Sequence, residues 1–325
     1  MRRRPFILLA SATALWPALA HAQRGDRLRV VAVLIPSGSR DWEAYLGTFK
    51  AYLQQLGWTE GGNIRFEQRL DEKSERLPVV GRELIALSPD VIFVTTNPAV
   101  AVLIKATRTI PIVFASVSDS VGSGFVANLA HPGGNVTGFH NFEPSIAGKW
   151  LEVLKQMAPG VRRVAIVHDP QIDANVAFLE VAQRLSGSTG VTVSGARVHD
   201  GGEMEPAITA FARESDGGLI VAPNPVNSTK RELLIGLAQR LNLPAIYPFR
   251  FFPDAGGLAS YGIDRSEQVR QAASYIDRIL RGTKPGDLPV QLPTKFELVI
   301  NLKTAKALRL NISQALLLRA DEVIQ

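Results

Sequence analysis

The segment PDVIFVTTNPAV, Pro89 to Val100, predicts both the fold class and the place of a binding site. Its apolar run, residues 91–94, is rich in β-branched residues and too short for a helix, which predicts a strand buried on both faces. The composition after it favours a helix, with Asn97 as N-cap and Pro98 as first residue. Ligands of open α/β sheets bind at such strand ends, where a helix N-terminus favours an anion. The alternative interpretation is an ordinary capped helix that binds no ligand, which explains the same pattern of residues.

Composition and charge limit the possible classes of function. The chain has 325 residues, of which 46% are hydrophobic and 20% are charged, and it contains no cysteine. This composition predicts a soluble globular protein of about two domains. The absence of cysteine excludes disulfides, thiol catalysis and cysteine-ligated metal. The net charge of +6 is small for a chain of this length, and the sequence contains no long run of basic residues. No nucleic-acid partner is therefore expected.

The first 22 residues have the pattern of a secretory signal peptide. Arg2-Arg3-Arg4 precedes an apolar segment, residues 6–19, which ends in Ala20-His21-Ala22. We expect cleavage after Ala22 and export to the periplasm, by the general secretory or the twin-arginine route. A membrane anchor is disfavoured because the segment is short and is broken by Pro17. Cleavage removes three arginines and lowers the net charge from +6 to +3.

The first half of the mature chain repeats a β-α unit, which calls for a parallel sheet with right-handed crossovers. The expected strands are 28–35, 63–70, 91–94, 109–117 and 135–139, and the expected helices are 41–56, 74–87 and 99–107. The helix at 41–56 shows the clearest apolar face.

A second α/β set of similar size begins after residue 140. Its expected helices are 145–157, 175–185, 203–213 and 230–241, and its expected strands are 161–168, 191–198, 218–222 and 244–249. The tail predicts a strand at 257–262, a helix at 265–280, a β-rich stretch at 288–302 and a helix at 315–323. No Ser/Gly-rich linker separates the two sets, so we expect a hinge of crossing strands between them.

Several segments resemble one family, the periplasmic substrate-binding proteins of ABC transporters, in the branch of tryptophan/tyrosine-binding proteins. The similarity covers essentially the whole chain. The segments are MRRRPFI (1–7), LGWTEGGNI (56–64), SPDVIFVTTNPA (88–99), IPIVFASVSDSVGSGFV (110–126), LAHPGGNVTGF (129–139), GKWLEVLKQMAPGV (148–161), GGLIVAPN (217–224), YPFRFF (247–252), GGLASYG (256–262) and LPTKFELVINLKTAKAL (292–308). The chain departs from many members at Ser120, where they have Pro, and at Asn224, where they have Asp or Ser.

The resemblance implies the type I periplasmic-binding-protein fold. In this α/β fold, two Rossmann-like lobes with parallel sheets are joined by crossing strands and hold a ligand in the cleft by hinge closure. The expected units are the signal peptide 1–22, an N-terminal lobe of 28–138 plus about 262–288, and a C-terminal lobe of 139–261 plus about 289–325. The implied partners are a small-molecule ligand, an amino acid of aromatic type, and an ABC permease with its ATPase. A monomer is expected.

An amino-acid ligand needs donors for its carboxylate, an acceptor for its ammonium group and a surface for its side chain. Thr95, Thr96 and Asn97 follow the apolar run 91–94 and are candidate ligand contacts. Thr96 and Asn97 can bind the carboxylate together with the N–H groups of the helix that they start. Other candidates of the first lobe are the hydroxyls of Ser37, Ser116 and Ser118, and Asp119 for the ammonium group. Capping of the turn 118–124 is an equally good role for Asp119.

The second lobe offers polar residues at strand ends and aromatic surfaces. Its candidate ligand contacts are Asp169, Asn224, Phe249, Asp254 and Tyr261. No catalytic residue, cofactor or metal is expected, because no nucleophile motif, P-loop or histidine pair at metal-ligand spacing is found. The match to G-x-G-x-x-A at 122–127 lies too close to the turn 132–134 for the helix that a dinucleotide site requires.

Two other functions are compatible with an α/β chain of this kind. One is a transferase that uses a nucleotide donor, although the signal peptide and the missing catalytic set argue against it. The other is a sensor in which the same binding fold presents its ligand to a receptor without transport. A substrate turnover assay distinguishes the transferase from a binding protein. A neighbouring pair of permease and ATPase genes favours transport over sensing.

Overall fold

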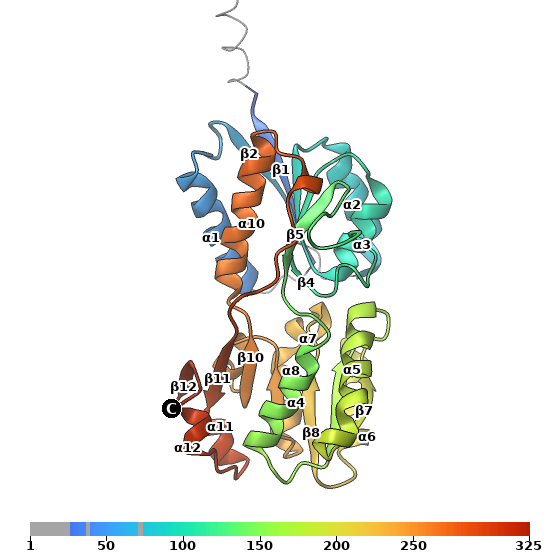
Figure 1. Cartoon of the computed structure of the whole chain (residues 1–325), viewed down its shortest axis with the longest axis vertical. Coiled ribbons are helices and arrows are strands. Elements are labelled where there is room, and N and C mark those ends of the chain that lie inside the picture. Colours follow the sequence, from blue (N-terminus) through green and yellow to red (C-terminus); the bar gives the residue numbers. More distant parts are fainter. Residues whose placement is uncertain (1–26, 37–39, 71–73) are drawn as a thin grey trace, which may run out of the picture.

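The computed structural model describes residues 27–36, 40–70 and 74–325, which form two α/β lobes stacked along the long axis of the molecule (Figure 1). The signal peptide predicted at 1–22 lies outside the described residues. No described helix is long and apolar enough to cross a membrane.

The first lobe contains a five-stranded parallel sheet in the order β2-β1-β3-β4-β5. Its strands are β1 (Arg29–Ile35), β2 (Ile64–Leu70), β3 (Val91–Thr95), β4 (Ile112–Val117) and β5 (Val136–His140). Every residue of β3, the strand predicted first, is buried. This burial follows from the position of β3 between β1 and β4, with helices on both faces of the sheet.

Helices cover the two faces of this first sheet. They are α1 (Arg40–Gln55), α2 (Leu77–Ala86), which follows the 3₁₀ turn η2 (Ser74–Arg76), α3 (Asn97–Ala106) and α10 (Arg265–Leu280). The apolar side chains of α1 and α10 form one core with one face of the sheet, and those of α2 and α3 form another core with the opposite face. Helix α10 therefore packs on the first lobe although it is distant in sequence (Figure 1).

The second lobe contains a seven-stranded sheet in the order β12-β11-β10-β9-β8-β6-β7. Its strands are β6 (Arg163–His168), β7 (Thr192–Arg197), β8 (Gly217–Val221), β9 (Ala245–Tyr247), β10 (Ala259–Gly262), β11 (Glu297–Asn301) and β12 (Glu322–Ile324). The pairings are parallel except that of β10 with β11. Parallel strands therefore dominate both sheets, as the repeated β-α pattern predicted.

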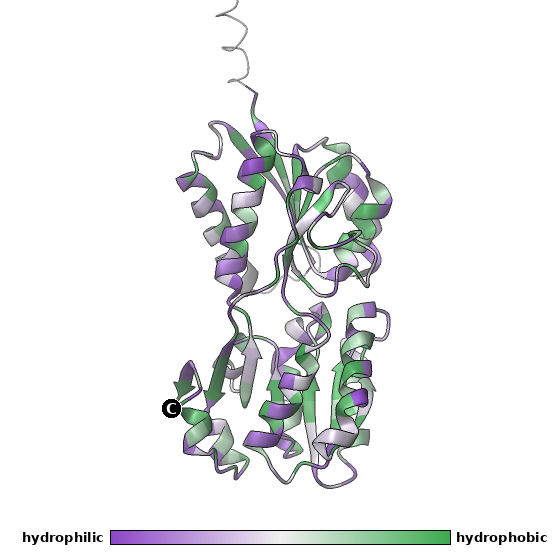
Figure 2. Cartoon of the chain, viewed as in Figure 1, coloured by the Kyte–Doolittle hydropathy of each residue, from purple (hydrophilic) through white to green (hydrophobic). Residues whose placement is uncertain are grey.

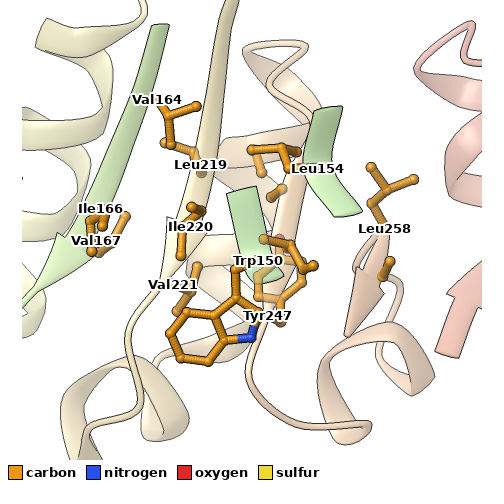
Figure 3. Close-up of a cluster of buried hydrophobic side chains, with 14 of the residues drawn as sticks. Trp150, Leu154, Val164, Ile166, Val167, Leu219, Ile220, Val221, Tyr247 and Leu258 are labelled. Atoms are coloured by element: carbon orange, nitrogen blue, oxygen red, sulfur yellow. The ribbon is translucent and has the colours of Figure 1, made fainter. Parts of the chain in front are cut away.

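The core of the second lobe lies between this sheet and its helices. The helices are α4 (Ile146–Met157), α5 (Asp173–Thr189), α6 (Gly201–Phe211), α7 (Pro225–Thr229), α8 (Arg231–Arg240), α9 (Phe251–Asp254), α11 (Leu302–Ala307) and α12 (Gln314–Leu317). Trp150 and Leu154 of α4 lie in one buried cluster with Leu219 of β8 and Tyr247 of β9 (Figure 3). Hydrophobic residues gather in the strands, while the outer helix faces are mixed or hydrophilic (Figure 2).

Three short segments connect the lobes, at 141–145, 263–264 and 292–296 (Figure 1). The third segment begins beside the first sheet, where Gln291 bridges to Phe139, and it leads into β11 of the second sheet. The chain between η3 (Pro285–Asp287) and the third segment is therefore part of the first lobe's edge.

Two expectations about local structure were wrong or incomplete. The helix expected at 315–323 is the single turn α12, and the chain then turns into strand β12, which pairs with β11. Helices α7, α9 and α11 were missed because each has at most six residues, too few for an apolar period to be visible.

Candidate functional site

A pocket lies between the two lobes at the carboxyl ends of their parallel strands. It is lined by Thr96, Asn97, Pro98, Ser116, Ser118, Asn141, Ile172, Pro223, Asn224, Pro225, Ser228, Phe249 and Arg265. The empty space is about 430 Å³, counted with its opening to solvent. The carboxyl ends of strands are where open α/β sheets bind ligands.

Thr96 forms the turn from β3 into α3 and has an unusual backbone. Its φ is +76°, a left-handed conformation that is strained for a β-branched residue. Its Oγ1 is buried and has no hydrogen-bond partner among the described residues. Strain of this kind persists at functional sites, where the surroundings hold it in place. Thr96 therefore has a hydroxyl without a partner among the described residues, beside the N-terminus of α3.

Asn97 has a different role from the predicted one. Helix α3 begins at Asn97 itself, and Thr96 occupies the N-cap position without a side-chain capping bond. The Asn97 Nδ2 donates to the Ser118 carbonyl at 2.7 Å, and its Oδ1 accepts from the Ser118 N–H at 3.0 Å. The Asn97 side chain thus ties the start of α3 to the end of β4, and it positions two walls of the pocket.

Ser116 and Ser118 use their hydroxyl hydrogens within the protein. Ser116 Oγ donates to Gln268 Oε1 at 3.0 Å, and Ser118 Oγ donates to Asn141 Oδ1 at 2.7 Å. Both acceptor atoms also receive a backbone N–H, from Ser116 and Phe142 respectively, so the amide orientations are determined. The serine oxygens are therefore left as acceptors, whereas the sequence suggested that they add hydroxyl donors.

Asn224 supplies the polar wall on the second lobe. It is buried at the N-terminus of α7, where its Oδ1 accepts from the Asn227 N–H at 2.7 Å. Its Nδ2 donates to Asn175 Oδ1 at 3.0 Å, and Asn175 Nδ2 donates to the Pro223 carbonyl at 3.1 Å. Asn175, which sequence reasoning missed, therefore holds both Asn224 and Pro223 in place.

Phe249 and Arg265 form the remaining wall. The guanidinium carbon of Arg265 lies 3.6 Å from the ring centroid of Phe249 and 5.1 Å from that of Phe251. Arg265 is only 7% exposed. Sequence reasoning missed it, although one signal was present: Asp264 caps α10, so Arg265 is a cation in the first helical turn, where the helix dipole disfavours positive charge.

Three predicted residues of the first lobe are not among those that line this pocket. Asp119 accepts from the Gly122 N–H at 2.9 Å, which is the turn-capping role considered for it. Thr95 is fully buried, and its Oγ1 has no hydrogen-bond partner in the described part of the chain. Ser37 lies outside the described residues.

Three predicted residues of the second lobe also lie elsewhere. Both carboxylate oxygens of the buried Asp169 lie 3.2 Å from Nδ1 of His199. Asp254 is exposed on α9 and pairs with Arg250 at 3.5 Å. The Tyr261 ring stacks on Phe296, with centroids 5.6 Å apart. The structure therefore brings together Thr96, Asn97, Ser116, Ser118, Asn224 and Phe249 of the predicted set.

The described residues contain no cluster of three or more His, Cys, Asp or Glu side chains that could hold a metal ion. Near the third connecting segment, burial raises the pKa of the Glu297 carboxyl, and Arg250 acts in the opposite direction. Glu297 lines a cavity that adjoins the pocket and shares Phe249 and Arg265 with it.

Comparisons with known proteins agree with this geometry. A family model described as ABC transporter substrate binding protein matches residues 30–324. The Tyrosine-binding protein of Clostridioides difficile (strain R20291) is 24% identical over 296 residues, which cover 90% of this chain and 84% of that protein.

Solved structures show the same architecture. An ABC domain from Streptococcus pneumoniae in complex with L-Trp has a TM-score of 0.85 and 23% identity, over 91% of this chain and 100% of that chain. A conserved domain protein from Vibrio cholerae O1 biovar El Tor has a TM-score of 0.85 and 28% identity, with the same coverage. These matches confirm the predicted fold, that of the type I periplasmic binding proteins.

Proposed function

Since the chain belongs to the family of ABC transporter substrate binding proteins, as its motifs predicted, we propose that it captures a small amino-acid ligand between its lobes and delivers it to an ABC permease and ATPase. The observation that carries this proposal is a pocket with walls from both lobes: Thr96 and Ser116 from the first, Asn224 and Phe249 from the second. A ligand in this pocket contacts both lobes at once.

The polar groups of the pocket suit the two charged ends of an amino acid. The acceptor oxygens of Ser116 and Ser118 bind the ammonium group, because their own hydrogens are already donated elsewhere. The hydroxyl of Thr96 and the N-terminus of α3 donate to the carboxylate.

The apolar part of the pocket suits an aromatic side chain. Phe249, Ile172 and Pro223 provide a surface on the second lobe. The similarity to a tyrosine-binding protein, and to a structure that contains L-Trp, supports an aromatic amino acid as the ligand.

Closure of the lobes about the three connecting segments completes the site. The proposed lobes are those expected from the sequence, 28–138 plus about 262–288 and 139–261 plus about 289–325, except that residues 289–291 are assigned to the first lobe, where Gln291 bridges to Phe139. The packing of α10 on α1 supports this division. A ligand that contacts both lobes favours the closed state by its additional contacts there.

The protein acts as a monomer in the periplasm after removal of residues 1–22. N-terminal sequencing of protein from the periplasmic fraction tests this part, and a start near Gln23 is expected. An uncut Met1 in that fraction contradicts the predicted signal peptide.

Binding is tested by native mass spectrometry of freshly purified protein, followed by calorimetric titration with L-tryptophan and L-tyrosine. A co-purified small molecule, or saturable one-to-one binding of either amino acid, is the expected result. Failure of both amino acids to bind protein that has been freed of ligand contradicts the proposed ligand class.

A further inference from the structure

We propose that Arg265 binds the ligand's carboxylate and makes the pocket selective for anionic ligands over their neutral analogues. This inference rests on the proposed function, because it assigns the recognition of charge within the same pocket.

Arg265 contacts both lobes. Its backbone starts α10, which packs on the first lobe, while its guanidinium lies on the rings of Phe249 and Phe251 from the second lobe. It also lines the adjoining cavity, which contains Tyr45, Arg250, Asp264, Ser266, Arg270 and Glu297. The guanidinium therefore lies where the two cavities meet.

Charge is the property that Arg265 adds to the pocket. It is the one charged side chain among the described residues that line the interlobe pocket. Hydroxyl and backbone N–H donors bind an amide oxygen as well as a carboxylate oxygen, so they discriminate less strongly between the two than a guanidinium does. A guanidinium in a largely buried site favours the ionised carboxylate, because the interaction between opposite charges is stronger there than in water.

The stacking on Phe249 prepares the guanidinium for this role. The guanidinium carbon lies 3.6 Å from the centroid of the Phe249 ring, so the ring restricts the movement of the guanidinium. A planar donor fork whose orientation is fixed loses little conformational freedom when a carboxylate binds. Lysine at this position keeps the charge but lacks both the fork and the flat stack.

The test compares the wild-type protein with R265Q and R265K by calorimetric titration. The probes are L-tryptophan and L-tryptophanamide, in which a neutral carboxamide replaces the carboxylate. For R265Q we expect about a ten- to hundredfold loss of affinity for L-tryptophan and a change below about threefold for the amide. For R265K we expect an intermediate loss for L-tryptophan.

The matched control is R278Q, which alters an exposed arginine at the far end of the same helix and is expected to leave both affinities unchanged. Melting temperatures without ligand verify that each variant is folded. Equal losses for both probes in R265Q and R265K, or no loss, overturn this inference while the proposed function stands. Failure of wild-type protein to bind either probe overturns the proposed function together with the inference.

Discussion

Gln268 accepts two hydrogen bonds from Ser116, from its backbone N–H at 2.9 Å and from its hydroxyl at 3.0 Å. The two residues are 152 positions apart, and Gln268 lies on α10 directly after the second connecting segment. The amide of Gln268 also donates, at 2.8 Å, to the carbonyl of His140, the last residue of β5 before the first connecting segment. A single buried side chain thus links the pocket wall to two of the three connections between the lobes.

Replacing Gln268 by leucine should therefore destabilise the protein and weaken binding. The change leaves the buried Ser116 N–H and the His140 carbonyl without partners, which predicts a loss of about 2–4 kcal/mol in the free energy of unfolding. Urea unfolding measures this loss. The control is Q271L, which alters an exposed glutamine one turn further along and should change stability by no more than about 0.5 kcal/mol. Equal effects of the two changes contradict the role given to Gln268.

Ligand binding should bring the lobes closer together. The pocket has walls from both lobes, so closure increases the contacts of a bound ligand. Small-angle scattering with saturating L-tryptophan is expected to give a smaller radius of gyration than scattering without it. An unchanged radius at proven saturation argues against hinge closure.

Glu297 predicts a pH dependence of stability. Burial raises the pKa of its carboxyl above the ordinary value of 4.5, so the folded protein holds this proton to a higher pH than the unfolded chain. The contribution of Glu297 to stability therefore falls as the pH rises through the interval above that ordinary value. E297Q removes the titration. We expect the melting temperature of E297Q minus that of wild type to increase as the pH is raised from about 4 to about 7. A difference that stays constant contradicts the raised pKa.

Much of the fold was predictable because its elements are long and periodic. Strand β3 was recognised from its β-branched run, and α10 was predicted with the bounds that it has in the structure, Arg265–Leu280. The tail was less predictable. Strand β12 is a strand because it pairs with β11, and a three-residue segment carries no local signal of such a pairing.

The site was predictable only where it lies at strand ends. Thr96, Ser116, Ser118 and Asn224 were found because polar residues follow buried strands, and such positions meet at one edge of a parallel sheet. Arg265 was missed because its contact with Phe249 crosses between the lobes. Hydrogen-bond direction is also invisible in a sequence: only the partners Gln268 and Asn141 reveal that the two serines are acceptors.

The Thr96→Val variant tests most directly the claim that the strained turn after β3 binds the ligand. The change removes one hydroxyl donor with little change in volume, and a hydrogen bond to a charged group is worth about 1.5–3 kcal/mol. We therefore expect the affinity for L-tryptophan to fall about ten- to a hundredfold. The melting temperature without ligand should hold, because the Thr96 hydroxyl has no partner among the described residues.

Thr95→Val is the matched comparison, because its hydroxyl is equally unpartnered in the described part of the chain but does not line the pocket. The deciding measurement is a calorimetric titration of both variants with L-tryptophan beside their melting curves. If the strained turn binds the ligand, Thr96→Val alone has reduced affinity, and both variants are as stable as wild type or more so. Unchanged affinity in Thr96→Val, with a lowered melting temperature, would contradict the account and make Thr96 a structural residue only.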